Sequence, residues 1–446
     1  MSDALMWTAV YFGLQIVLGL PIGFVLISTV VVYSLAAGID MSLMAERVIF
    51  ASVENIIVIA IPLFIFTAKV MDHGGISDRL LKFCLALVGH RPGGLAQVNI
   101  VSSVIFSGMS GDATSDASGI GQVLIRMMRQ ENRYPPAYAA AVTVASSSIG
   151  PIIPPSIPML VYAFFSGASV GALFLAGIVP GLIMAVAMMA LVAYQSRRRG
   201  FPTEAKITGS ALVSATVRAI GPLLMPVILL GGIYSGVFTP TEAAAVAGAY
   251  AVLLSVFLYR MSSWAALYDA LLDSAKQSGM VFLLIGGGFA LNYVFTVEKV
   301  TEAITTFILS MELTQLQLLM VVHAAFIVMG MFLTKAPMMY VVIPALIPGL
   351  TAAGIDLVHF GVIIVLNMMI SMITPPMGLM VFIVGGLAGT LVIVRPGGAS
   401  FGWSMLLPLA EWVSPASRSR LVAMTSVAPA FSAADRICAL AASRPT

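Results

Sequence analysis

Two proline-containing stretches decide the fold: residues 146–162 read SSSIGPIIPPSIPMLVY, and residues 367–383 read NMMISMITPPMGLMVFI. They align without gaps, and their Pro-Pro pairs stand in register. Proline removes a backbone donor and clashes with the preceding turn, so each pair interrupts a helix. Both stretches are uncharged, and carbonyls freed in lipid are tolerated only where they face protein or a cavity. Matched interruptions of this kind indicate inverted repeats, whose broken helices form a substrate and ion site near the bilayer midplane.

The composition places the whole chain in a membrane. Of its 446 residues 60% are hydrophobic and only 9% are charged, and the mean hydropathy is +1.03. A soluble domain carries about 25% charged residues, so this chain cannot cover a water-facing surface. A crossing helix needs about 20 apolar residues, and the uncharged stretches are long enough for roughly ten or more membrane segments. The formal charge of +3 gives no bias toward nucleic acid.

The positive charges predict the topology, because Lys and Arg concentrate in cytoplasmic loops. Basic clusters stand at residues 82–91, 126–133 and 197–199. If all three are cytoplasmic, residues 92–130 enter and leave on the same side and form a re-entrant hairpin, while residues 134–166 form the first broken helix. The uncharged stretch 4–39 fits either one long span or two short ones.

The same reasoning divides the chain into two repeats of an all-α polytopic membrane protein. The first repeat covers residues 1–200, and a cytoplasmic linker covers residues 201–217. The second repeat, residues 218–394, contains a hairpin at about 313–350 and a broken helix at about 357–390. Residues 395–446 are rich in Ala, Ser, Arg and Pro. We hypothesise that the reading frame changed near residue 390, so that this tail is unrelated to the fold.

Neutral oxygen atoms gather at both interruptions. Hydroxyl and backbone oxygens held by unwound chain suit a hard monovalent cation such as Na⁺. The alternative is a kinked packing helix whose hydroxyls bond to their own backbone. The matched pair favours the cation, and either interruption alone leaves both readings open.

Charged residues stand at both expected hairpin tips. Asp112 and Asp116 lie in the polar run 110–116, and carboxylates within membrane segments usually line a polar pathway. The competing interpretation is a shallow hairpin whose aspartates cap a helix. At the second tip, Lys335 has the charge to attract a carboxylate substrate, but a Lys near a helix end more often extends to the membrane interface. The second interpretation of Lys335 is favoured.

Five stretches together resemble one family, the large membrane subunit of the tripartite ATP-independent periplasmic (TRAP) transporters. The resemblance runs from about the first apolar span to residue 389. The stretches that carry it are FSGMSGDATSDASGIGQVLI (106–125), AVTVASSSIGPIIPPSIPMLVY (141–162), GALFLAGIVPGL (171–182), TPTEAAAVA (239–247) and GIDLVHFGVIIVLNMMISMITPPMGLMVFIVGG (354–386).

The resemblance implies an elevator-type secondary transporter, not an enzyme, that imports small organic acids with Na⁺ across the bacterial inner membrane. It also implies two partners: a periplasmic substrate-binding protein and a small membrane subunit, expected as a separate polypeptide. The family's ion sites match residues 103–110, 147–150 and 367–375 here. Two positions depart from the family pattern, namely Asp112, where Ser is more common, and the pair Thr334-Lys335, where an acidic residue is common.

These arguments give a defined set of candidate residues. The candidate Na⁺ ligands are Ser103, Ser107, Gly108, Ser110, Asp112, Asp116, Ser147, Ser148, Gly150, Thr334, Asn367, Ser371, Thr374 and Pro375. The candidate substrate contacts are Ser147, Pro154, Pro155, Lys335 and Thr374.

Two rival functions remain. One is an Na⁺-coupled carboxylate symporter that works without a binding protein, because the repeat argument fits it equally well. The more remote rival is an intramembrane aspartyl protease, suggested by Asp112 and Asp116. Such enzymes bring together two carboxylates from different segments, and two carboxylates in one short tip argue against it.

Overall fold

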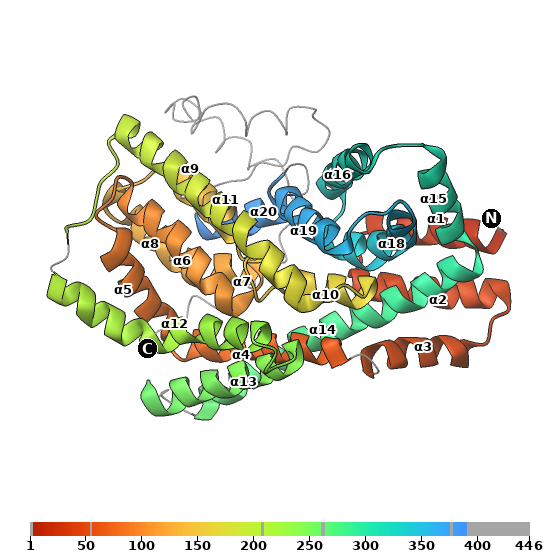
Figure 1. Ribbon diagram of the computed structural model, residues 1–446, viewed down its shortest axis with the longest axis horizontal. Helices are drawn as coiled ribbons and strands as arrows, with labels where there is room; N and C mark the ends of the chain where they lie inside the picture. The colour runs from red at the N-terminus through yellow and green to blue at the C-terminus, as the bar shows by residue number, and fades with distance from the viewer. Residues whose placement is uncertain (1–2, 54–55, 207–208, 260–263, 375–377, 390–446) are drawn as a thin grey trace, which may run out of the picture. The chain divides into compact units, whose positions relative to one another are not determined.

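The computed structural model describes residues 3–53, 56–206, 209–259, 264–374 and 378–389, and every element within these ranges is a helix (Figure 1). Helices satisfy their own backbone polar groups, which apolar segments in lipid require. The helices long and apolar enough to cross a membrane are Ile56–His73, Val170–Arg199, Gly209–Tyr234, Pro240–Leu258, Trp264–Val297, Gln315–Phe332 and Lys335–Ala352. Six further apolar helices of the described chain are shorter.

The N-terminal stretch forms two helices, α1 (Asp3–Val17) and α2 (Ile22–Ala37), which pack against each other. The chain turns between them at Gly19, whose φ of 72° is left-handed, and Pro21 precedes α2. The Ser28 hydroxyl donates to the Gln15 side chain at 2.7 Å and joins the pair. The stretch 4–39 is therefore two short helices.

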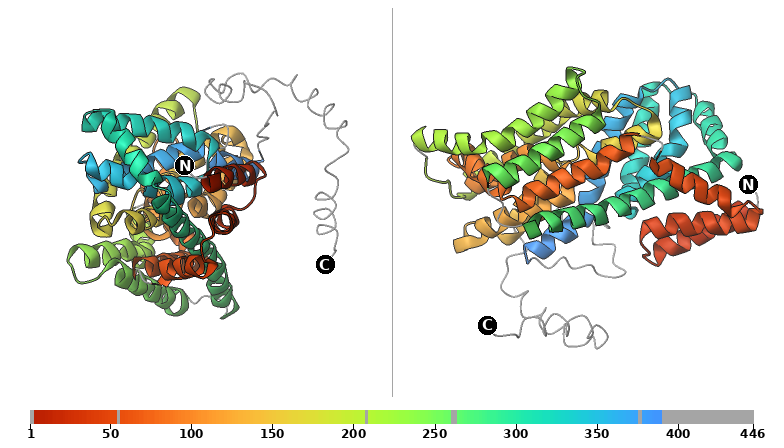
Figure 2. Two further views of the ribbon diagram at one scale, coloured as in Figure 1. Left: turned by 90° about the vertical axis from the view of Figure 1, so that its right-hand side faces the viewer. Right: turned by 90° about the horizontal axis from the view of Figure 1, so that it is seen from below.

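A framework of long helices follows. Helix α14 (Trp264–Val297) packs against α2, α3 (Met41–Val53) and α4 (Ile56–His73), and α13 (Pro240–Leu253) also packs against α4 (Figure 2). Three consecutive glycines in α14, at 286–288, let its neighbours approach: an added Cβ at each would lie 2.8–2.9 Å from the nearest atom of Val48, Leu26 or Tyr340. The stretch 264–276 forms the start of α14.

The two predicted hairpins share one order of elements. In the first, α6 (Gly94–Ser110) ends at Gly111, and a short helix α7 (Ala113–Asp116), a π-helical turn η1 (Ala117–Gly121) and α8 (Gln122–Arg129) follow. In the second, α16 (Gln315–Phe332) is followed by α17 (Lys335–Pro337), a π-helical turn η4 (Met338–Val342) and α18 (Ile343–Ala352). Each tip therefore has two non-helical residues, followed by a short helix and a π-turn.

Both predicted broken helices are interrupted. The first consists of α9 (Pro136–Ser147) and α10 (Ile157–Ser166), and the second consists of α19 (Leu357–Ile373) and α20 (Leu379–Leu387). Their contacts are reciprocal: α10 packs against α19, and α20 packs against α9. The leading half of each broken helix thus contacts the trailing half of the other, as two oppositely directed copies would.

The remaining helices connect these parts. Helix α5 (Ile76–Val88) packs on α6, α11 (Val170–Arg199) packs on α6 and α19, and α15 (Val300–Ser310) packs on α18. A 3₁₀ turn, η2 (Gln130–Asn132), follows α8; a π-turn, η3 (Leu254–Leu258), extends α13. Helix α12 (Gly209–Tyr234) begins within the stretch predicted as a linker. The frame-shift hypothesis concerns residues outside the described ranges.

Candidate cation and substrate site

The tip of the first hairpin is fixed by Asp112, the N-cap of α7. Its Oδ2 atom accepts hydrogen bonds from the backbone N–H groups of Thr114, at 3.1 Å, and Ser115, at 3.3 Å, and from the Thr114 hydroxyl. The capping role considered from the sequence is therefore present, and it falls on Asp112. Capping leaves the other carboxylate oxygen, Oδ1, free to face outward from the tip.

The first tip rests directly on the first interruption. The Ile157 N–H donates to the Gly111 carbonyl at 3.3 Å, which joins the tip to the start of α10. Gly111 has a φ of 60°, and a Cβ there would collide with the Pro155 carbonyl. A Cβ at Gly150 would lie 3.6 Å from the Asp112 carbonyl. Gly111 therefore allows the backbone of the tip and the backbone of the interruption to come this close, and Gly150 lies in ordinary contact with the tip.

The second tip reaches the first through a single ion pair. The Lys335 ammonium lies 2.6 Å from Asp112 Oδ1. The Lys335 side chain is 33% exposed and that of Asp112 is 9% exposed. The interpretation of Lys335 as a side chain extending to the membrane interface is therefore wrong, because its charge is turned inward onto the other hairpin.

The second tip lies against the leading half of the second broken helix. A Cβ at Gly330, near the end of α16, would collide with Ser371 on α19. Helix α17 packs on α19 as well. The contacts at this junction thus run from the first interruption to the first tip, from the first tip to the second tip, and from the second tip to α19.

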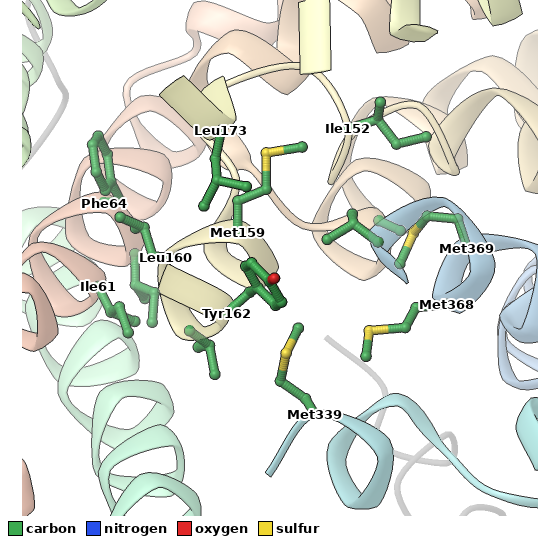
Figure 3. Close-up of a cluster of buried hydrophobic side chains, with 14 of the residues drawn as sticks. Ile61, Phe64, Ile152, Met159, Leu160, Tyr162, Leu173, Met339, Met368 and Met369 are labelled. Atoms are coloured by element: carbon green, nitrogen blue, oxygen red, sulfur yellow. The ribbon is translucent and has the colours of Figure 1, made fainter. Parts of the chain in front are cut away.

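A cluster of buried, mostly apolar side chains joins several of these segments, and Figure 3 shows it. Tyr162 comes from α10, Met368 and Met369 come from α19, Met339 comes from η4, and Ile152 comes from the first interruption. The Tyr162 hydroxyl donates to the Leu357 carbonyl at 2.7 Å, which ties α10 to the start of α19.

Asp116 is the least satisfied polar residue of the first tip. It is 1% exposed, and neither carboxylate oxygen has a hydrogen bond of ordinary geometry among the described residues, although the carboxylate interacts with the Ser103 hydroxyl. The Ser110 hydroxyl is likewise buried without a partner in the described part of the chain. A buried charge is costly unless it is paired, so Asp116 has the chemistry to hold a cation.

Asn367 shows the same property at the second interruption. It is fully buried, and neither its amide oxygen nor its amide nitrogen has a partner among the described residues. The Ser371 hydroxyl donates to the Asn367 carbonyl at 2.7 Å, and the Thr374 hydroxyl donates to the Ile370 carbonyl at 2.6 Å. The candidate Pro375 lies outside the described residues.

The serines of the first interruption donate to their own helix, as the packing interpretation predicts. Ser147 donates to the Thr143 carbonyl and Ser148 donates to the Ala145 carbonyl, both at 2.6 Å. Ser107 in α6 donates to the Val104 carbonyl at 2.6 Å in the same way. A hydroxyl that donates still has its oxygen lone pairs, so these bonds leave each Oγ able to accept a cation.

The remaining candidates occupy the two tips and their supports. Ser103 is 2% exposed within α6. A Cβ at Gly108 would lie 2.7 Å from the Pro226 side chain, so this glycine permits close packing. Thr334 is the N-cap of α17 and makes no capping hydrogen bond. The peptide bond between Pro154 and Pro155 is cis.

Sequence reasoning missed two polar residues that support the site. Asn99 on α6 donates to the Thr143 hydroxyl at 2.7 Å and accepts from the Ser146 hydroxyl at 3.1 Å, so it joins the hairpin to the broken helix. Asp72 at the end of α4 lines a cavity that Ser110 also lines. An Asn inside an uncharged run was a visible signal. Asp72 resembled an ordinary loop charge because Lys69 and His73 flank it.

The acidic side chains do not form a metal cage. Among the described residues, no three His, Cys, Asp or Glu side chains are grouped so that they could hold a metal ion. A cation at the junction would therefore depend on one carboxylate together with hydroxyl, amide and carbonyl oxygens. That mixture of ligands suits Na⁺ better than a transition metal.

A sequence profile of the family described as "Tripartite ATP-independent periplasmic transporter, DctM component" matches residues 9–411. Curated relatives agree with this match over most of both chains. The chain is 36% identical to the sialic acid TRAP transporter large permease protein of Vibrio cholerae, over 82% of this chain and 86% of the relative.

Two further relatives carry names with other substrates. The chain is 34% identical to the 2,3-diketo-L-gulonate TRAP transporter large permease protein of Escherichia coli, over 78% of this chain and 82% of the relative. It is 33% identical to the C4-dicarboxylate TRAP transporter large permease protein of Pseudomonas aeruginosa, over 80% and 84%. All three relatives are named as transport permeases, and none is named as an enzyme.

Proposed function

Because the chain belongs to the DctM family of TRAP transporter large permeases, we propose that it imports small organic acids with Na⁺ as the coupling ion. The chain is a multi-pass membrane permease and not an enzyme, so the rival of an intramembrane aspartyl protease is wrong. The coupling ion, the substrate class and the transport cycle are the proposed parts.

The contacts that link the first interruption, the two hairpin tips and α19 carry the proposal. Asp116 and Ser110 at the first tip and Asn367 on α19 have buried polar atoms without a hydrogen bond of ordinary geometry among the described residues. A helix bundle that served only as packing would satisfy these groups internally. Unpaired oxygens at interrupted helices support a cation site.

The proposed cycle uses the cation to prepare the site for an anion. In the absence of a cation, Asp116 leaves a buried negative charge that repels a carboxylate. A cation bound there neutralises this charge and orders the first tip, so the affinities for Na⁺ and substrate rise together. The two hairpins, proposed to be re-entrant from opposite faces, then move with the broken helices past the framework of α4, α13 and α14. This is the elevator movement, and it exposes the site to the other side.

The relatives support the substrate class and the partners. Their names give sialic acid, 2,3-diketo-L-gulonate and C4-dicarboxylates, all of which carry a carboxylate. The family description is of a tripartite periplasmic transporter. We therefore propose that a periplasmic binding protein delivers the organic acid and that a small membrane subunit completes the permease in the bacterial inner membrane.

Uptake by reconstituted vesicles tests the function. Vesicles containing both membrane subunits and the binding protein should accumulate labelled organic acid when an inward Na⁺ gradient is applied. A K⁺ gradient of equal size is the control and should give no accumulation. Uptake that ignores the Na⁺ gradient would remove the coupling proposal.

Leaving the binding protein out of the vesicles distinguishes the proposal from the alternative of a symporter that works without one. Vesicles that lack the binding protein should show no uptake at low substrate concentration under the proposal. Equal uptake with and without the binding protein would favour the alternative.

A further inference from the structure

The ion pair between the hairpin tips is the one described interaction that joins two charges from the two halves of the chain. Lys335 Nζ and Asp112 Oδ1 are 2.6 Å apart and 223 residues apart in sequence. Of the two other ion pairs of the described residues, Arg133–Glu204 joins two non-helical segments and Lys276–Asp273 lies within α14. The pair therefore stands where the two proposed repeats meet.

The Asp112 carboxylate is fully engaged. Three donors of its own tip bind Oδ2, and the ammonium binds Oδ1. A carboxylate offers about four lone-pair positions, so these four donors take up most of its capacity. A mobile cation near Oδ1 would compete with the Lys335 ammonium.

The Lys335 ammonium, in contrast, is only partly engaged. It carries three N–H donors, and Asp112 is its one partner among the described residues. Its side chain is 33% exposed, so the surrounding side chains do not close it off completely. The unused donors of an ammonium form strong charge-assisted hydrogen bonds with a carboxylate.

We propose that Lys335 is a tethered cation that shares its ammonium between Asp112 and the carboxylate of the substrate. The inference rests on the proposed function, because it assigns the anion-binding group of that same site. Asp112 holds the ammonium at the junction in the absence of substrate. An incoming carboxylate takes the free donors and loosens the contact between the tips, which links substrate binding to movement of the second hairpin.

Neutral and charged variants separate this role from a purely structural one. Lys335→Met alone leaves Asp112 as an unpaired charge, so the informative variant is the neutral pair Asp112→Asn with Lys335→Met. The single variant Asp112→Asn removes the carboxylate that competes with the substrate for the Lys335 ammonium. Lys276→Met, in an exposed ion pair of α14, is the matched control.

The experiment measures protection against thermal unfolding by sialate and by succinate, at one Na⁺ concentration and again without Na⁺, using the purified full chain with its small subunit. The neutral pair should need about ten- to hundredfold more of the protecting acid than the wild type, the loss expected for one charge-assisted hydrogen bond. Asp112→Asn should need less acid than the wild type, and Lys276→Met should match the wild type.

Three results would overturn the inference. Equal losses of protection in Asp112→Asn and in the neutral pair would mean that Lys335 only holds the two tips together and does not bind the substrate. Unchanged protection of the neutral pair would place the carboxylate elsewhere. A wild type protected by neither acid would contradict carboxylate binding at the junction. A separate result, protection by acid that does not depend on Na⁺, would remove the coupling proposal and leave the role of Lys335 standing.

Discussion

The two hairpin tips share a backbone design but differ in charge. Each tip has a two-residue gap, an extended N-cap residue, a short helix and a five-residue π-turn. Gly330 stands four residues before the N-cap Thr334, just as Gly108 stands four residues before the N-cap Asp112. The first tip carries two carboxylates, whereas the second carries one ammonium.

The difference shows that packing and charge are separate properties of the repeat. The glycines and π-turns let both tips come close to the interrupted helices. The charges are divided so that one carboxylate of the first tip is neutralised by the second tip and the other is not. The unneutralised Asp116 is the position at which we propose that a mobile cation completes the charge balance.

The largest expected effect comes from removing the unpaired carboxylate of the first tip. Asp116→Asn keeps the size of the side chain and removes its charge. We expect the Na⁺ concentration for half-maximal uptake to rise by about ten- to hundredfold, because a charged ligand is lost. The measurement is Na⁺-dependent uptake by vesicles. Asp273→Asn, an exposed aspartate of α14, is the control, and equal behaviour of the two variants would contradict the role of Asp116.

The next effect comes from breaking the ion pair between the tips. Lys335→Met should lower the free energy of unfolding by about 2 kcal/mol, less than the 3–5 kcal/mol of a fully buried pair, because the Lys335 side chain is partly exposed. Adding Asp112→Asn should restore most of this loss by removing the unpaired charge. Thermal unfolding in detergent measures both variants. A double variant as unstable as the single one would show that packing, and not charge, sets the loss.

A smaller effect on stability is expected for the glycines that precede the two tips, Gly330 and Gly108, and it should differ between them. Gly330→Ala should destabilise by about 1–3 kcal/mol, because the new methyl group collides with Ser371 on α19. Gly108→Ala should cost less, because the nearest atom, in the Pro226 side chain, is 2.7 Å away. Unfolding midpoints of the two variants give the order, and the reverse order would mean that the first tip is the more tightly packed.

The smallest effect on stability is expected for a glycine outside the tips, which gives a reference for the other glycine substitutions. Gly279 in α14 has no atom within 4 Å of an added Cβ. Gly279→Ala should therefore stabilise by less than about 1 kcal/mol through helix propensity alone. A marked destabilisation would show an unrecognised contact on this face of α14.

The interruptions could be predicted from sequence because proline acts locally. The start of each trailing helix agrees between the repeats to within one residue of the alignment, at Ile157 and Leu379. The ends of the leading helices do not agree: α9 stops at Ser147, whereas α19 continues to Ile373. The first stretch has Gly150 and Pro151 at positions where the second has Ser371 and Met372, residues that permit a helix. Alignment alone therefore predicts that a break occurs but not its length.

The pairing of charges could not be predicted in the same way. Lys335 was judged by its position near a helix end, and that local rule gave the wrong environment. Its partner lies in the other half of the chain, so the contact exists only because both tips fold onto the same junction. The unpaired state of Asp116 depends on tertiary structure for the same reason.

Equilibrium binding of radiolabelled Na⁺ to the purified chain with its small subunit tests the central claim most directly. The wild type should bind Na⁺ saturably, Asp273→Asn should bind it equally well, and Asp116→Asn should lose most of the binding over the same concentration range. Equal saturable binding by the wild type and Asp116→Asn would contradict the claim that the first hairpin tip holds the coupling ion.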